Sequence, residues 1–145
     1  MSEQPYFRSA VACRIVSLDR VKFNDAVASG TYPCAPSTTG GSARLFTEED
    51  LLPLFFFARL TEFGLSTGKA GSMACEIASR VATSKKRSNH ITLSYGVSTN
   101  VWAMGEKRHA GLGRLIFTVV FHIADVRRII ADGINAEAKK GELYI

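Results

Sequence analysis

The chain has 145 residues, of which 46% are hydrophobic and 21% are charged. This balance excludes an intrinsically disordered chain and suffices for one compact domain, or for two small lobes that share a core. No apolar run reaches the roughly 18 residues that a membrane-spanning helix needs, and the first residues lack the basic and apolar segments of a secretory signal. We therefore expect a cytoplasmic protein without membrane contact.

The net charge of +5 is concentrated in the second half of the chain. Residues 1–73 hold seven Lys and Arg against seven Asp and Glu, whereas residues 74–145 hold eleven against six. A basic chain favours a polyanionic partner such as nucleic acid. Two cationic runs, Lys85-Lys86-Arg87 and Lys107-Arg108, are candidates for nonspecific phosphate binding. The alternative for the first run is that it stabilises a helix C-terminus, and the alternative for the second is a solvated turn.

Two short helices are expected near the N-terminus. The first spans 7–16 and ends at Ser17, and the second spans 18–29 and ends at Gly30, whose freedom at positive φ suits that position. In the second helix Arg20 and Asn24 share a face at i,i+4 spacing, and Lys22 lies roughly 200° from Arg20. The positions expected to be buried in the second helix are Leu18, Val21, Phe23 and Val27.

Residues 31–46 contain the prolines, glycines and hydroxyl residues of a loop or of a two-stranded wing. Gly40 and Gly41 would form its tip, because paired glycines accept the positive φ values of tight hairpin turns. Thr47-Glu48-Glu49-Asp50 then predicts the capped start of a helix over 47–63. Pro53 falls about two turns into that helix and predicts a kink near Glu49.

The helix over 47–63 is apolar around most of its circumference, so we expect it to be buried by its own domain, by a second lobe or by another subunit. After Gly64, Ser66 caps a helix over 66–83 with a clear amphipathic repeat. The apolar positions of the first helix are Leu51, Leu52, Leu54, Phe55, Phe56, Phe57, Leu60 and Phe63, and those of the second are Ala70, Met73, Ala74, Ile77, Ala78 and Val81.

The pattern changes to β-structure after residue 84. Residues 90–95 alternate in polarity, as in a half-buried strand, and 115–121 are apolar and β-branched, as in a well-buried one. A further strand is expected over 101–104, and the closing helix presents Val126, Ile129, Ile130 and Ile134 before Gly141. The predicted fold class is α+β, with a mostly helical lobe over 1–83 and a small lobe of a β-sheet and one helix over 84–145.

Residues that would carry catalysis, a metal or a cofactor were sought, and none is predicted. Gly64 to Ala70 is one residue short of a phosphate-binding loop and ends in Ala where a hydroxyl is needed. His90, His109 and His122 lack metal-ligand spacing, and Glu48-Glu49-Asp50 fits a helix cap better than a metal cluster. From the wide, odd set Cys13, Cys34 and Cys75 we expect free thiols instead of a disulfide framework or a zinc site.

The segment Arg44-Leu45-Phe46-Thr47-Glu48-Glu49-Asp50-Leu51 resembles the wing exit of MerR-type winged helix-turn-helix domains, with its basic residue, aromatic residue and acidic cap. The apolar helix ending at Phe63-Gly64 and the turn Gly30-Thr31-Tyr32-Pro33 are similar to that family in the same order. Pro33-Cys34-Ala35-Pro36 and Gly41-Ser42-Ala43-Arg44 are similar to a divergent, phage-like group of these proteins. The resemblance covers about the first half of the chain.

The resemblance implies a DNA-binding protein that is not an enzyme. Helix 18–29 would enter the major groove of double-stranded DNA, with Arg20, Lys22 and Asn24 on base edges or phosphates. The wing, with Gly40, Gly41 and Arg44, would lie along the adjacent phosphates, and Lys85, Lys86 and Arg87 would add nonspecific contacts. Simpler roles stay open: Arg20 and Lys22 as solvated surface residues, and Arg44 as an ion-pair partner of Glu48 or Asp50.

These observations lead to the hypothesis of a small transcriptional regulator. We expect a homodimer, because helix 47–63 has excess apolar surface and one short module recognises few base pairs, and we expect no small-molecule ligand. The alternatives are a protein–protein adaptor on a winged-helix scaffold and an excision or recombination accessory factor. A positive strip between helix 18–29 and the wing would favour DNA, and a neutral strip with exposed Phe55–Phe57 would favour the adaptor.

Overall fold

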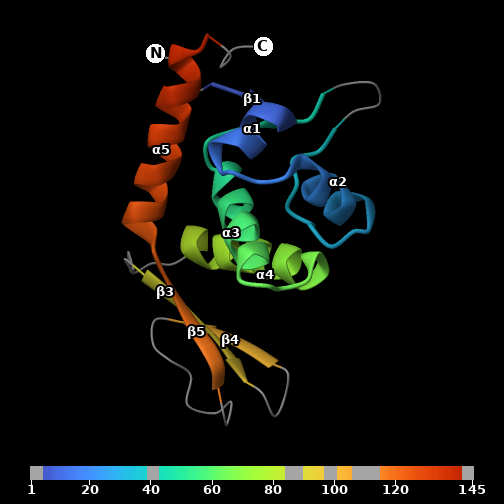
Figure 1. Ribbon diagram of the computed structural model, residues 1–145, viewed down its shortest axis with the longest axis vertical. Helices are drawn as coiled ribbons and strands as arrows, with labels where there is room; N and C mark the ends of the chain where they lie inside the picture. The colour runs from blue at the N-terminus through green and yellow to red at the C-terminus, as the bar shows by residue number, and fades with distance from the viewer. Residues whose placement is uncertain (1–4, 39–42, 84–89, 97–100, 106–114, 142–145) are drawn as a thin grey trace.

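The computed structural model describes residues 5–38, 43–83, 90–96, 101–105 and 115–141, and these form an α+β fold (Figure 1). A helical part carries a small antiparallel sheet at one end, and the C-terminal helix runs back from the sheet along the helical part. The elements in chain order are β1 (Phe7–Arg8), α1 (Ser9–Ile15), α2 (Arg20–Ala28), β2 (Leu45–Phe46), α3 (Leu51–Glu62), α4 (Thr67–Thr83), β3 (His90–Gly96), β4 (Val101–Gly105), β5 (Leu115–His122) and α5 (Ile123–Lys139).

The N-terminal segment and the expected wing differ from the sequence-based prediction. Phe7 and Arg8 are extended and pair antiparallel with Leu45 and Phe46, so the first helix begins at Ser9. In the described part of 31–46, β2 is the strand, and it pairs with β1 instead of with a second strand of its own segment. The pairing places Phe7 opposite Phe46, and both rings are fully buried, which favours this partner over a local hairpin.

The start of α3 explains why Pro53 causes no disruption. Thr47 and Asp50 cap each other: the Asp50 carboxylate accepts from the Thr47 backbone N–H at 2.9 Å, and the Thr47 hydroxyl accepts from the Asp50 N–H at 3.3 Å. Because the helix begins at Leu51, Pro53 lies in its first turn, where a backbone N–H has no partner within the helix. The kink expected near Glu49 was therefore a wrong prediction, since Glu49 precedes the helix.

The apolar residues of α3 are buried inside the single chain. Phe56 and Phe57 are fully buried, Phe55 is 5% exposed, and Phe63 alone of the predicted set is exposed. Helix α4 packs along α3 and begins at a cap formed by Ser66, whose hydroxyl accepts from the Lys69 N–H at 3.3 Å. The excess apolar surface from which a homodimer was inferred is thus already covered by this chain's own core.

The sheet has the order β4-β3-β5, and both pairings are antiparallel. The predicted strands are confirmed, but β5 is an edge strand in which Phe121 is buried while Val120 is 44% exposed. In the central strand, Thr92 and Ser94 are buried together with Ile91 and Leu93, so the expected alternation is not observed. The Phe121 ring lies 4.9 Å from the Phe56 ring, which joins the sheet to α3.

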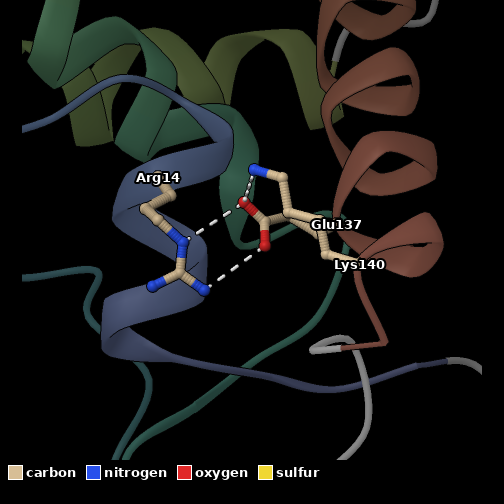
Figure 2. Close-up of polar contacts among 3 residues, drawn as sticks. All are labelled: Arg14, Glu137 and Lys140. Atoms are coloured by element: carbon tan, nitrogen blue, oxygen red, sulfur yellow. Dashed lines mark hydrogen bonds and ion pairs between the residues drawn. The ribbon is translucent and has the colours of Figure 1, made fainter.

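Helix α5 joins the two halves of the chain by packing against α1 and α3. Val126 and Ile130 are buried as predicted, whereas Ile129 is 50% exposed. Between α5 and α1, the Glu137 carboxylate accepts from both Nε and Nη2 of Arg14, at 3.2 and 3.3 Å, and lies 3.7 Å from the Lys140 ammonium (Figure 2). Glu137 is only 4% exposed, so this ion pair connects residues 123 apart in sequence at a buried contact.

Replacing Glu137 by Gln is expected to lower the free energy of unfolding at neutral pH by about 1 kcal/mol, because Arg14 is partly solvated. The Arg14 hydrogen bonds lower the pKa of Glu137 from its ordinary 4.5, although burial acts in the opposite direction. Because the pKa of Glu137 is lower in the folded than in the unfolded chain, the carboxylate contributes stability that is complete above pH 4.5. This contribution is lost as the pH falls through the lowered pKa of the folded state. In urea titrations, the free energy of unfolding should fall less between pH 7 and pH 3 in Glu137→Gln than in the wild type.

The matched control is Glu76→Gln, which removes an exposed carboxylate paired with Arg80 at 3.4 Å within α4. This change is expected to cost less than about 0.5 kcal/mol at either pH. Equal losses for the two variants at pH 7 would contradict a stabilising role for the buried carboxylate.

The expectation of free thiols is wrong for two of the three cysteines. Cys34 and Cys75 form a disulfide with a Cα–Cα distance of 5.6 Å, which attaches the segment after α2 to α4. The spacing of the cysteines gave no indication of this pairing, because it depends on how α4 packs beside that segment. Cys13 keeps its thiol and is buried in the core.

Within the described ranges, no helix has both the length and the apolar character needed to cross a membrane.

Candidate nucleic-acid interface

Helix α2 is held at the surface by one apolar side and by caps at both ends. Phe23 and Ala26 are buried, and the Phe23 ring lies 5.5 Å from that of Tyr32 and 5.6 Å from that of Phe46, in edge-to-face geometry. At its N-terminus the Asp19 carboxylate accepts from the Val21 N–H at 2.9 Å. These contacts anchor α2 in the core and leave the rest of its circumference in solvent.

The exposed surface of α2 carries the predicted contact residues Arg20, Lys22 and Asn24. The same surface includes Asp25 and Val21. Val21 was predicted to be buried, but it is 63% exposed. The buried residues of this nine-residue helix are Phe23 and Ala26, so most of its side chains are exposed. The surface therefore combines one guanidinium, one ammonium, one amide and one apolar side chain with a carboxylate.

Arg44 has a different partner from either of those considered. Its Nη1 donates to the carbonyl oxygen of Pro36, and no ion pair with Glu48 or Asp50 is observed in the described part of the chain. Glu49 instead pairs with Arg127 of α5, at 2.7 Å. A guanidinium has five N–H donors, so the contact with Pro36 does not use up the capacity of Arg44 for phosphate.

Five other predicted contact residues lie outside the described residues. They are Gly40, Gly41, Lys85, Lys86 and Arg87. The predicted interface is therefore described for α2 and for Arg44.

Arg59 is a site residue that sequence reasoning missed. It extends from α3 to the turn between α1 and α2, where its Nη2 donates to the carbonyl oxygens of Val16 at 3.0 Å and Ser17 at 3.3 Å. Its guanidinium carbon also lies 5.1 Å from the centre of the Phe55 ring. A signal was present, because Arg59 is the single charged residue between Asp50 and Glu62 in an otherwise apolar helix.

The chemistry of the described thiols and acids gives no second kind of site. Burial raises the pKa of the Cys13 thiol to about 11, so at neutral pH this cysteine is a protonated, unreactive group. His90 and His122 face each other across β3 and β5 with ring centres 6.4 Å apart. Among the residues whose positions are described, no group of three His, Cys, Asp or Glu side chains is placed to hold a metal ion.

Comparison with known protein families finds no family that matches this chain, and no curated protein matches it.

Proposed function

We propose that the protein is a small DNA-binding regulator that inserts α2 into the major groove of double-stranded DNA. The observation that carries the proposal is the exposure of Arg20, Lys22 and Asn24 on α2, which follows α1 after a tight turn and buries Phe23 and Ala26 in the core. A helix of this kind has the right diameter for the major groove, and Arg and Asn match the edges of guanine and adenine.

Two features of the fold support this assignment of α2. The Asp19 carboxylate is engaged by the N-terminus of the helix, which compensates part of its charge near the proposed phosphate contacts. Helix α2 lies on the side of the molecule opposite α5 (Figure 1), so neither α5 nor the sheet covers its outer surface.

A shift assay at low salt with genomic fragments, followed by selection of the bound fragments, tests the proposal directly. We expect binding with a steep salt dependence, and Arg20→Ala should weaken it by about ten-fold and reduce the salt slope by about 1 if Arg20 contacts phosphate. Asn24→Ala should instead relax the sequence preference with little change in the salt slope.

The control is Arg128→Ala, which removes an exposed cation of α5 whose partner is Asp125 of the same helix. Equal weakening by Arg20→Ala and Arg128→Ala would mean that only net charge matters. Absence of any binding at low salt would overturn the proposal.

The other functional hypotheses share parts of this surface. Exposed rings at Phe55–Phe57 would have favoured the adaptor hypothesis, but these rings are buried. An excision or recombination accessory factor would use the same DNA contacts, and the selected fragments would identify it. The homodimer remains a prediction that sedimentation with and without DNA can test, and it no longer has support from α3.

A further inference from the structure

The turn between α1 and α2 has an unusual residue at its most constrained position. Helix α1 ends in a Schellman motif, in which the Leu18 N–H donates to the Cys13 carbonyl at 2.8 Å and the Ser17 N–H to the Arg14 carbonyl at 3.1 Å. Ser17 therefore has a φ of 56°, and it is the one residue other than glycine with positive φ in the described part of the chain. A side chain makes this conformation costly.

Two other helices of the same chain end in the same motif and use glycine. After α2, the Thr31 N–H donates to the Ala26 carbonyl at 2.9 Å, with Gly30 at a φ of 75°. After α3, the Leu65 N–H donates to the Leu60 carbonyl at 3.3 Å, with Gly64 at a φ of 95°. The turn after α1 thus lacks the residue that makes this conformation accessible elsewhere, and it needs another source of stability.

The Arg59 side chain donates hydrogen bonds to the backbone carbonyls of the turn after α1. Its Nη2 donates to the carbonyls of Val16 and Ser17, the two residues at the bend, and the same atom lies 3.1 Å from the Glu62 carboxylate. Each of these bonds favours the arrangement in which both carbonyls point toward α3. The turn is therefore fixed from outside, by a side chain about 40 residues away in sequence.

Arg59 occupies this place at a local energetic cost. Its Nε is buried against α3 without a hydrogen-bond partner among the described atoms. A buried unpaired donor is unfavourable, so an apolar side chain of similar length would pack on Phe55 at least as well. The role of Arg59 is thus better explained by the two carbonyls that it holds than by a contribution to the core.

We propose that Arg59 is a positioning residue that holds Ser17 in its left-handed conformation and so sets the direction in which α2 leaves α1. This inference rests on the proposed DNA-binding function, because the direction of α2 decides how Arg20 and Asn24 meet the groove. In this proposal Arg59 acts on DNA binding through Ser17 and α2.

Three variants separate positioning from general stability. Arg59→Met keeps an apolar side chain on Phe55 and removes the Nη2 donor of both hydrogen bonds. Ser17→Gly removes the conformational cost, and the third variant combines the two changes. Arg59→Met should weaken DNA binding by about ten-fold, which corresponds to the free energy needed to hold one residue other than glycine in the left-handed conformation. The double variant should recover to within about three-fold of the wild type, since glycine adopts positive φ without help.

A second measurement follows the turn without DNA. Amide hydrogen exchange of Leu18, whose N–H donates across the turn at 2.8 Å, should become at least about ten-fold faster in Arg59→Met and slow again in the double variant. The amide of Thr31, in the glycine-containing motif after α2, is the internal reference. Arg80→Met, the same replacement at an exposed position of α4, controls for the loss of one cation.

The outcomes are distinguishable. If the wild type binds no DNA, the proposed function is overturned, and the positioning role of Arg59 is then decided by the exchange of Leu18 alone. If Arg59→Met unfolds the protein or accelerates all amides equally, Arg59 is a structural residue and the inference is overturned. If Ser17→Gly fails to restore affinity or protection in the Arg59→Met background, the coupling between the two residues is excluded.

Discussion

Reduction of the bond between Cys34 and Cys75 is expected to lower the free energy of unfolding by roughly 3–4 kcal/mol. The two cysteines are 41 residues apart, and the closed loop contains α3 and the first half of α4. Cross-linking a loop of this length removes a large part of the conformational freedom of the unfolded chain, and reduction restores that freedom. The expected effect is a large share of the total stability of a domain of this size.

Urea titrations with and without a strong dithiol reductant measure the effect. The double variant Cys34→Ser with Cys75→Ser should unfold near the midpoint of the reduced wild type and should not respond to reductant. Cys13→Ala serves as a second control, because Cys13 takes no part in the bond and its response to reductant should equal that of the wild type. Identical midpoints for oxidised and reduced wild type would contradict the prediction.

The reduced protein should keep its fold near α2, because other contacts hold the same segment. Tyr32 is buried between Phe23 and Phe57, with its ring 5.5 and 5.4 Å from theirs. Beyond Cys34, the Pro36 carbonyl accepts a hydrogen bond from Arg44. Reduction is therefore expected to release residues 33–38 from α4 before it affects the position of α2.

The elements that the sequence predicted well are those whose determinants are local. The Thr47–Asp50 cap, the Ser66 cap and the turn at Gly30 each depend on residues within a few positions of one another, and each is confirmed. The amphipathic repeat of α4 is likewise a property of one segment. Such features are determined by short-range hydrogen bonding and periodicity, which a sequence states directly.

The features that were missed depend on contacts between distant segments. Leu45–Phe46 pairs with Phe7–Arg8, and Cys34 pairs with Cys75, in each case because the folded helices bring the partners together. The exposure of Arg20, Lys22 and Asn24 could be predicted because a surface helix needs few partners, whereas Val21 was wrongly predicted to be buried. The role of Arg59 could not, because the carbonyls that it holds become acceptors only when α3 packs across the turn.

Replacing Gly71 by Ala is expected to destabilise the protein by about 2–3 kcal/mol, although alanine is the better helix former. Gly71 lies inside α4 at the point where Thr31 crosses that helix. A Cβ atom at this position would overlap the Thr31 carbonyl oxygen and lie 3.0 Å from its carbonyl carbon. Both atoms belong to the backbone, so relief requires the segment after α2 to move away from α4.

Gly68→Ala is a matched control in the same helix, one turn earlier. Its Cβ would lie 3.6 Å from the Thr31 methyl group, an ordinary contact distance. This change should leave stability unchanged or raise it by about 0.5 kcal/mol, through the helix propensity of alanine. The two substitutions are chemically identical, so opposite signs in urea titrations would isolate the approach of the Thr31 backbone as the cause.

The consequence of Gly71→Ala should extend to α2, because Thr31 is attached to the C-terminal end of that helix. The Thr31 N–H and hydroxyl both donate to the Ala26 carbonyl, at 2.9 and 3.1 Å, so a displaced Thr31 pulls on the last turn of α2. Amide exchange of Thr31 should therefore accelerate in Gly71→Ala and stay at the wild-type rate in Gly68→Ala. If both variants retain wild-type stability and exchange, the close packing of Thr31 on α4 does not determine the position of α2.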